Sequence, residues 1–291
     1  MEKINGSNPS PFKEWMQRKK ESIRKNTNIV RELVKKNIKV QYRNSIIGAL
    51  WTILNPLLNM LVMYFVFSGL FGKDDKTYAL YLLCAQITFT AMRTATTQSL
   101  PSIVRNRGLL TKNKISEYVF PISCNISAII NFLFSFVALL GVMVWVTFSQ
   151  GVQVFSWSIL MTLIMLPALF LFNLGMSFIL TTMYVYFRDI MHFYNVFLTL
   201  WTYLTPMFYK PDTLLKGMGP VAKWLIEFTF EINPMYHFVE YFRDIIYRSV
   251  GNPVLFPDVG RTLGIYGIGI LFFGIGILIF SLTRKKFIYN I

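Results

Sequence analysis

Five or six apolar runs of about 20 residues restrict the fold of this chain more than any other feature of its sequence. A helix of that length crosses the hydrocarbon core of a bilayer, and a helix also satisfies its own backbone hydrogen bonds where water is absent. Hydrophobic residues make up 54% of the 291 positions, so little length remains for a domain outside the membrane. We therefore predict an all-α polytopic membrane protein.

Six transmembrane helices are expected, over residues of about 46–70, 79–100, 122–148, 157–184, 191–209 and 262–283. The second is the most polar and contains Arg93. A cation near the bilayer centre costs about 2.5 to 3.5 kcal/mol on insertion scales, so Arg93 should be paired, extend to the nearer surface or line an aqueous path. In the last span two glycine pairs, 267 with 274 and 269 with 276, repeat at seven residues and predict close helix packing.

Two segments outside the spans are expected to be helical. Around residues 28–45, apolar side chains fall on one half of a helix and cations on the other, a pattern typical of a helix in the plane of a membrane surface. Those cations are Arg31, Lys35, Lys36, Lys39 and Arg43. A surface helix of a soluble domain is the alternative. Residues 210–261 are too charged to span and too apolar for a free loop, which predicts short re-entrant helices with a turn at Asn233-Pro234.

This pattern divides the chain into a tail with an interfacial amphipathic helix, residues 1–45, and a transmembrane domain, residues 46–291. Gly48 lets the backbone turn between them. No secretory signal peptide is expected. If the N-terminus is cytoplasmic, the six spans place 20 Lys and Arg against 6 Asp and Glu inside. The positive-inside rule then puts both termini in the cytoplasm, and the basic balance reflects lipid and topology rather than nucleic-acid binding.

Several kinds of chemistry have no motif in this sequence. It lacks the G-x-x-x-x-G-K-[ST] phosphate loop, HExxH, CxxC and G-x-S-x-G. Cys84 and Cys124 lie in apolar segments without ligand-like spacing, and His192 and His237 lie far apart, so we expect no metal site. We therefore expect no enzyme activity and no cofactor in this chain alone, and any transport it performs must take its energy from elsewhere.

Five stretches in order carry a family resemblance: YRNSIIGALWTILNPLLNMLVMYFVF, the segment Leu110 to Ser123, FRDI, LTPMFY and INPMYHFVEYFRDI. Together they resemble permease subunits of ABC-2 type exporters of lipid-linked polysaccharides, a group that includes O-antigen, capsule and wall teichoic acid exporters. The resemblance covers roughly residues 28–285. One departure lies at residues 114–117, where the family usually has a Phe-Pro-Arg-Glu-like run and this chain has Lys-Ile-Ser-Glu.

The resemblance implies a multi-pass protein of the bacterial cytoplasmic membrane that acts as a homodimer with two ATP-binding subunits. ATP and Mg would be bound by those subunits, and the cargo would be an undecaprenyl-diphosphate-linked polysaccharide. The loop of about Pro101 to Tyr118 would carry a coupling helix seated on the ATPase, with candidate contacts at Arg105, Arg107, Lys112, Lys114 and Glu117. The alternative for this loop is a solvated basic segment that only sets topology.

Aromatic faces stack on sugar rings without requiring one register, which suits a sliding polymer. The candidates for this path are Trp51, Tyr64, Tyr203, Phe208, Tyr209 and Tyr236, with Arg93. Membrane-interface belts are the alternative for the aromatic residues. The cations of the interfacial helix would attract either the lipid pyrophosphate or ordinary anionic lipid.

Three other functional classes are alternatives. A membrane-embedded glycan or lipid transferase would need an acid or base, available only in the outer cluster Glu227, Glu231, His237, Glu240 and Asp244. An ABC-2 exporter of drugs or ions would share the architecture. A channel is disfavoured because no filter sequence is visible.

Overall fold

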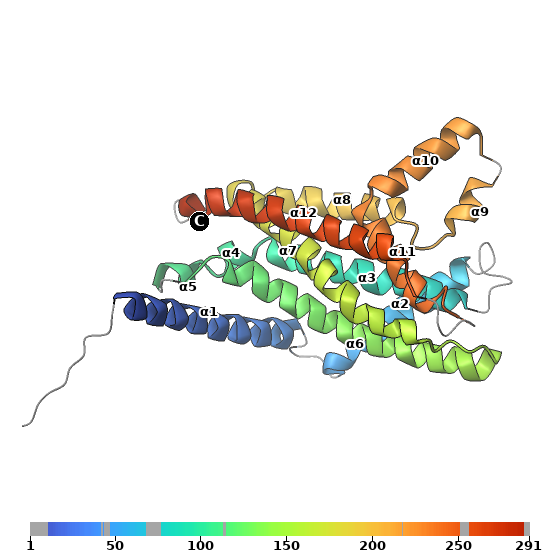
Figure 1. Ribbon diagram of the computed structural model, residues 1–291, viewed down its shortest axis with the longest axis horizontal. Helices are drawn as coiled ribbons and strands as arrows, with labels where there is room; N and C mark the ends of the chain where they lie inside the picture. Colours follow the sequence, from blue (N-terminus) through green and yellow to red (C-terminus); the bar gives the residue numbers. More distant parts are fainter. Residues whose placement is uncertain are drawn as a thin grey trace, which may run out of the picture.

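The computed structural model describes residues 11–41, 43, 47–67, 77–112, 115–216, 218–250 and 256–287. Every regular element in these ranges is a helix. The long helices α3 (Tyr78–Ser99), α6 (Val119–Gln150), α7 (Thr162–Tyr186) and α12 (Val259–Thr283) run along the long axis of the molecule (Figure 1). The all-α prediction is therefore confirmed for the part of the chain that the structure describes.

Three stretches are long and apolar enough to cross a membrane: Val119–Ser149, Trp157–Tyr186 and Val259–Thr283. They agree with the expected spans at 122–148, 157–184 and 262–283. The second starts as a 3-10 helix, Trp157–Met161, and continues as α7.

The other three expected spans form helices that are either shorter or more polar than these three. Helix α2 (Trp51–Phe67) has 17 residues and α8 (Ile190–Leu204) has 15, fewer than the roughly 20 that a perpendicular crossing needs. Helix α8 ends five residues before the expected boundary at 209, because Pro206 has no backbone N–H to continue the ladder. Helix α3 has 22 residues but carries many polar side chains. The count of six spans therefore stays a prediction.

Helix α1 (Pro11–Gln41) begins well before the helix expected around residues 28–45, and its second half packs on α6. Asn37 Nδ2 donates to Ser127 Oγ at 3.5 Å, and Asn131 Nδ2 donates to Gln41 Oε1 at 3.0 Å. The second contact lies four residues after the first on both helices, so α1 and α6 run side by side in the same direction. Leu33 is buried against this protein surface, which corrects the expectation that the whole apolar half of α1 meets lipid. The orientation of α1 to the membrane stays a prediction.

The turn from α1 to α2 contains Gly48, which has a φ of +58° and starts the 3-10 helix Gly48–Leu50. Glycine adopts this left-handed conformation without the steric penalty of other residues, which agrees with the expected role of Gly48, and the turn from the membrane surface into the bilayer stays a prediction.

Only one of the two glycine pairs of α12 packs closely against another described helix. A Cβ on Gly276 would overlap the carbonyl oxygen of Gly175 in α7, and one on Gly269 would lie 2.8 Å from that of Ala168. Gly267 and Gly274 face open space. Residues 267 and 269 are about 200° apart on a helix, so the two pairs lie on nearly opposite faces and one neighbouring helix covers only one of them.

Short helices fill the remaining described segments. Helices α4 (Ser102–Arg105) and α5 (Arg107–Lys112) follow α3, in place of the single short helix expected there. Helices α9 (Pro211–Leu215), α10 (Pro220–Ile232) and α11 (Pro234–Ile246) precede α12. The expected turn at Asn233 is confirmed, and the Asn233 side chain caps α11 by accepting from the Met235 backbone N–H at 3.0 Å. Helix α11 is buried, whereas α9 and α10 project from the bundle (Figure 1).

Candidate functional site

Helix α3 has an open face that is entirely polar. Sixteen of its 22 residues are buried, and they pack towards α2, α6, α7 and α11. At 100° per residue, most of the remaining residues fall on one stripe. We call these residues the α3 stripe: Gln86, Thr90, Arg93, Thr94 and Thr97. The sixth incompletely buried residue, Gln98, flanks the stripe.

The neighbouring long helices show the opposite pattern. On α6 the exposed large side chains include Leu133, Val137 and Trp145, and on α12 they include Leu263 and Ile270. Apolar side chains suit contact with lipid, where polar groups are costly. The α3 stripe is therefore built for contact with water or with a polar ligand.

Arg93 is exposed on this stripe. Within the described residues it has no carboxylate partner, which leaves two of the three roles expected for it: extension to a surface, or lining of a polar path. Thr97 Oγ1 donates to the Arg93 carbonyl at 2.6 Å. The hydroxyl proton is therefore used within the helix, and the lone pairs of the oxygen stay available to accept a hydrogen bond.

The helices beside α3 also expose polar side chains. Helix α2 exposes Asn55 and Asn59, one turn apart, on the side away from its contact with α6. Helix α8 exposes Asn195 and Thr199 in the same spacing. Both helices contact α3, and both also expose large apolar side chains, such as Leu58 on α2 and Phe193 on α8.

Four of the predicted pathway aromatics belong to one connected set. Phe208 stacks on Phe67 with ring centroids 5.5 Å apart and contacts Tyr203 at 6.5 Å. Tyr209 donates its hydroxyl to the Tyr203 carbonyl at 3.1 Å. Tyr64 contacts Tyr78 at 6.2 Å, and the Tyr78 hydroxyl donates to the Phe208 carbonyl. We call this the aromatic set: Tyr64, Phe67, Tyr78, Tyr203, Phe208 and Tyr209.

The other two predicted aromatics lie elsewhere. Trp51 begins α2, at the opposite end of that helix from Phe67. Tyr236 stacks on Phe230 at 5.3 Å, at the junction of α10 and α11.

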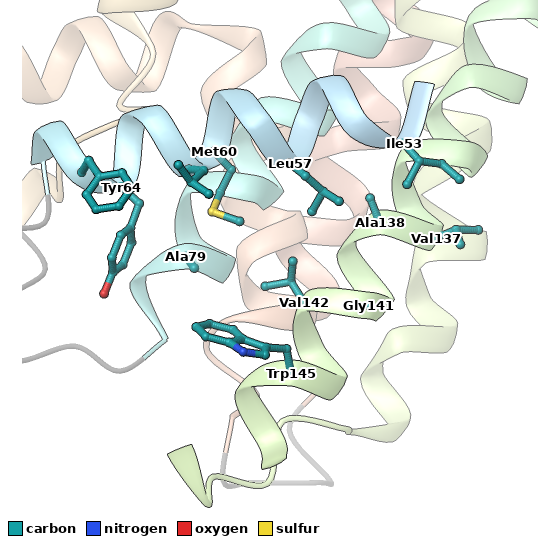
Figure 2. A pocket seen from close by; sticks show the side chains of 12 residues that line it. Ile53, Leu57, Met60, Tyr64, Ala79, Val137, Ala138, Gly141, Val142 and Trp145 are labelled. Atoms are coloured by element: carbon teal, nitrogen blue, oxygen red, sulfur yellow. The ribbon is translucent and has the colours of Figure 1, made fainter. Parts of the chain in front are cut away.

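Tyr64 also lines an apolar groove of about 610 Å3 between α2 and α6 (Figure 2). Leu57 and Met60 form one wall, and Val137, Gly141 and Trp145 form the other. Such a lining offers almost no hydrogen-bonding groups, so this groove suits hydrocarbon and not a glycan.

Sequence reasoning missed a completely buried arginine, Arg243 on α11. Its guanidinium lies 3.5 Å from the centre of the Tyr81 ring and donates to the Met207 carbonyl at 3.2 Å. It also donates to Glu240 at 2.7 Å. The charges three residues apart on α11 could have indicated the Glu240 pair, but no local pattern predicts contacts with Tyr81 and Met207.

The same network occupies the carboxylates that a transferase would need. Glu240 also pairs with Arg248, and Asp244 pairs with Arg248 and Arg261. Burial raises the pKa of Glu240, but the Arg243 and Arg248 guanidiniums outweigh burial and hold the pKa below its ordinary value. Glu240 is therefore a fixed carboxylate and a poor proton donor at neutral pH.

The rest of that outer cluster is only loosely organised. Glu227 lies 3.8 Å from Lys223, and the His237 ring bonds the Glu231 carbonyl at 2.8 Å. In the described ranges no group of His, Cys, Asp and Glu side chains could hold a metal ion.

The predicted coupling residues are partly described. Arg105 and Arg107 are exposed on α4 and α5, and Glu117 lies 3.7 Å from Arg284. Lys114 and the side chain of Lys112 lie outside the described residues.

The cations of α1 do not form one site. Arg31, Lys39 and Arg43 are exposed, and Lys35 pairs with Glu32 at 2.8 Å. Lys36 instead reaches α4, where its Nζ donates to Asn106 Oδ1 at 3.2 Å.

Residues 29–247, which include the last 13 residues of α1, the α3 stripe and all of α11, match the family described as ABC-2 type transporter. The chain belongs to the ABC-2 type transporter family. This family membership and the apolar helices make the chain an integral membrane protein of a permease family, and such permeases are not themselves catalytic.

Two relatives extend the comparison of this ABC-2 family member. It is 26% identical over 255 residues to the O-antigen export system permease protein RfbA of Myxococcus xanthus, covering 88% of this chain and 92% of the relative. It is also 26% identical over 230 residues to the protein of the same name from Klebsiella pneumoniae, covering 76% of this chain and 80% of the relative.

Proposed function

We propose that this chain is the permease of an ATP-driven exporter that moves an undecaprenyl-diphosphate-linked polysaccharide across the bacterial cytoplasmic membrane. Two copies of the chain form the path, and two separate ATP-binding subunits hold ATP and Mg and supply the energy. Both termini are cytoplasmic. The names of the relatives, which are O-antigen export permeases, support a cargo of this class.

The α3 stripe is the observation that carries this proposal. Its threonine and glutamine side chains offer neutral hydrogen bonds, which are individually weak and exchange readily with those of a hydroxyl-rich polymer. One copy leaves the stripe open along α3. A second copy facing it would enclose the polar surface away from lipid, as a bilayer requires.

The aromatic set adds a second element of the same path. It lies where α2 ends and α3 begins, the end of α3 opposite to α4. Tyr203 is exposed, so its ring is accessible to a ligand. Apolar ring faces suit the CH groups of a sugar, and they hold a glycan without fixing its register.

Energy would enter at the other end of α3. The exposed cations Arg105 and Arg107 lie on α4 and α5, directly after α3 in the chain. Ile103, at the start of this segment, is fully buried in a cluster that includes Phe120 of α6 and Phe178 of α7. A push on this segment is therefore transmitted to two long helices.

Cysteine accessibility in the assembled four-subunit exporter tests the path. Thr90→Cys and Thr94→Cys should react with a membrane-impermeant thiol reagent, and Leu133→Cys on the apolar face of α6 should not. The native Cys84 and Cys124 are buried and give a low background. Equal protection of the stripe and the control positions would contradict the proposal.

The cargo needs its own experiment. Cells depleted of this protein should accumulate lipid-linked glycan on the cytoplasmic side. If the glycan is exported normally while a small molecule is retained, the cargo assignment fails and an ABC-2 exporter of small molecules replaces it.

A further inference from the structure

A small polar cavity lies where α1, the end of α3 and α4 meet. Its volume is about 250 Å3, several times the roughly 30 Å3 that one water occupies in the liquid. Six residues line it: Lys36, Asn37, Val40, Gln41, Gln98 and Arg105.

Among the described residues, the lining carries two cations and no acid. The acids nearest along the sequence have cationic partners of their own: Glu32 pairs with Lys35 at 2.8 Å, and Glu117 lies 3.7 Å from Arg284. The positive charge of Lys36 and Arg105 is therefore not neutralised by any residue that lines the cavity.

The amide side chains of the cavity have unused hydrogen-bonding capacity. Asn37 Nδ2 makes only long contacts, 3.5 Å to Ser127 Oγ and 3.9 Å to Cys124 Sγ. Gln98 Oε1 is buried and has no hydrogen-bond partner among the described residues. Gln98 Oε1 is an acceptor, so it requires a donor such as water and does not itself attract an anion, whereas the Asn37 amide is a donor that an anion could use.

We propose that this cavity binds the phosphate or diphosphate of a lipid headgroup. The planar guanidinium of Arg105 suits two phosphate oxygens at once, and the ammonium of Lys36 adds a point charge. Asn37 supplies a neutral donor. Because Gln98 directly follows Thr97, an anion held here lies at one end of the α3 stripe.

The anion site does not depend on what the protein exports. Its assignment to the diphosphate of the glycan carrier rests on the proposed function. In that assignment the cavity holds the headgroup at the entrance of the polar path while the glycan extends along α3.

The test compares two double variants of the full chain in phosphatidylcholine nanodiscs. Lys36→Gln with Arg105→Gln removes both cavity cations, and the amide introduced in place of the Lys36 ammonium can still donate to Asn106. Lys35→Gln with Lys39→Gln removes the same charge from the same helix outside the cavity. The probes are farnesyl diphosphate and inorganic pyrophosphate, measured by equilibrium binding at fixed salt.

The cavity variant should bind farnesyl diphosphate about 100-fold more weakly, about tenfold for each charge-assisted contact, and the control variant less than about twofold. Arg105→Lys, which keeps the charge and loses the planar fork, should give an intermediate affinity. Equal weakening of both double variants would show general attraction to α1 and would overturn the site, as would unchanged binding by the cavity variant.

Two further arms identify the source of the anion. If inorganic pyrophosphate binds as tightly as farnesyl diphosphate, the lipid-headgroup assignment is overturned in favour of a free phosphate. Competition by phosphatidylglycerol in the nanodisc would support a general anionic lipid headgroup. If the unmodified assembly binds the probe but exports no lipid-linked glycan, the proposed function fails and the site stands.

Discussion

Replacing Arg243 with methionine would remove the charge that holds α11 in the bundle. The side chain is 0% exposed, so nothing in the solvent can replace its contacts. The substitution leaves the Met207 and Tyr81 carbonyls without their buried donor and removes the cation from the face of the Tyr81 ring. It also leaves Glu240 with Arg248 as its only remaining cation among the described residues.

Breaking a buried ion pair from one side costs about 3 to 5 kcal/mol when the other charge stays buried, and here the buried Glu240 keeps only the partly exposed Arg248 as a partner among the described residues. We therefore expect Arg243→Met to lower the free energy of unfolding by about that amount. Arg261→Gln is the matched control: its side chain is 56% exposed, and a solvent-exposed ion pair contributes about 0 to 1 kcal/mol. The assay is reversible unfolding in mixed detergent micelles, followed by circular dichroism and by intrinsic fluorescence.

A second substitution tests the reason for the loss. Adding Glu240→Leu to Arg243→Met removes the uncompensated carboxylate and should recover part of the lost stability. If Arg243→Met unfolds within about 1 kcal/mol of the unmodified protein, or if the double variant is less stable than the sum of the single ones, the network does not hold α11 as described.

The remaining predictions concern the same network and the contact between α7 and α12. Glu240 has a pKa below its ordinary value in the folded protein, so its ion pairs stabilise the fold above the unfolded pKa, and this contribution disappears as the pH falls through the folded pKa. The stability difference between the unmodified protein and Glu240→Gln, measured by unfolding across acidic and neutral pH, should be largest near neutrality and shrink in acid; a constant difference would rule out an ionic origin. Gly276→Ala should reduce thermal stability because its Cβ would overlap the Gly175 carbonyl oxygen, whereas Gly274→Ala has open space and should leave the melting temperature within about 1 °C or raise it. Equal melting temperatures for the two alanine variants would contradict the close helix contact.

The parts of the fold that depend on local composition could be predicted from the sequence. Three spans are continuous apolar runs, and the turn at Asn233 follows from a capping asparagine before a proline. The end of α8 was placed five residues too late, although Pro206 was a visible signal for an earlier stop. The sequence pattern alone does not locate such a helix end well, because apolar side chains continue beyond the last helical residue.

The parts of the site that depend on distant pairing could not be predicted. Lys36 and Asn106 meet across 70 positions, and Arg243 and Tyr81 across 162. The charge pattern of α1 made all of its cations equivalent, whereas in the fold Lys36, although exposed like Lys39, reaches Asn106 at the end of α4. The glycine repeat in α12 likewise could not show which of its two faces a neighbouring helix covers.

Helix α3 explains why these separate features belong to one functional surface. Its 22 residues extend about 33 Å, close to the thickness of the hydrocarbon core. Tyr78 and the aromatic set lie at its first turn, Arg93 lies in its second half, and Gln98 borders the polar cavity beside α1 at its last turn. The open residues in between are polar, while the buried ones anchor α3 to α6, α7 and α11. A helix with its apolar side in the protein and its polar side exposed is the reverse of what lipid requires, so in the proposed assembly α3 is the helix that the second copy of the chain would cover.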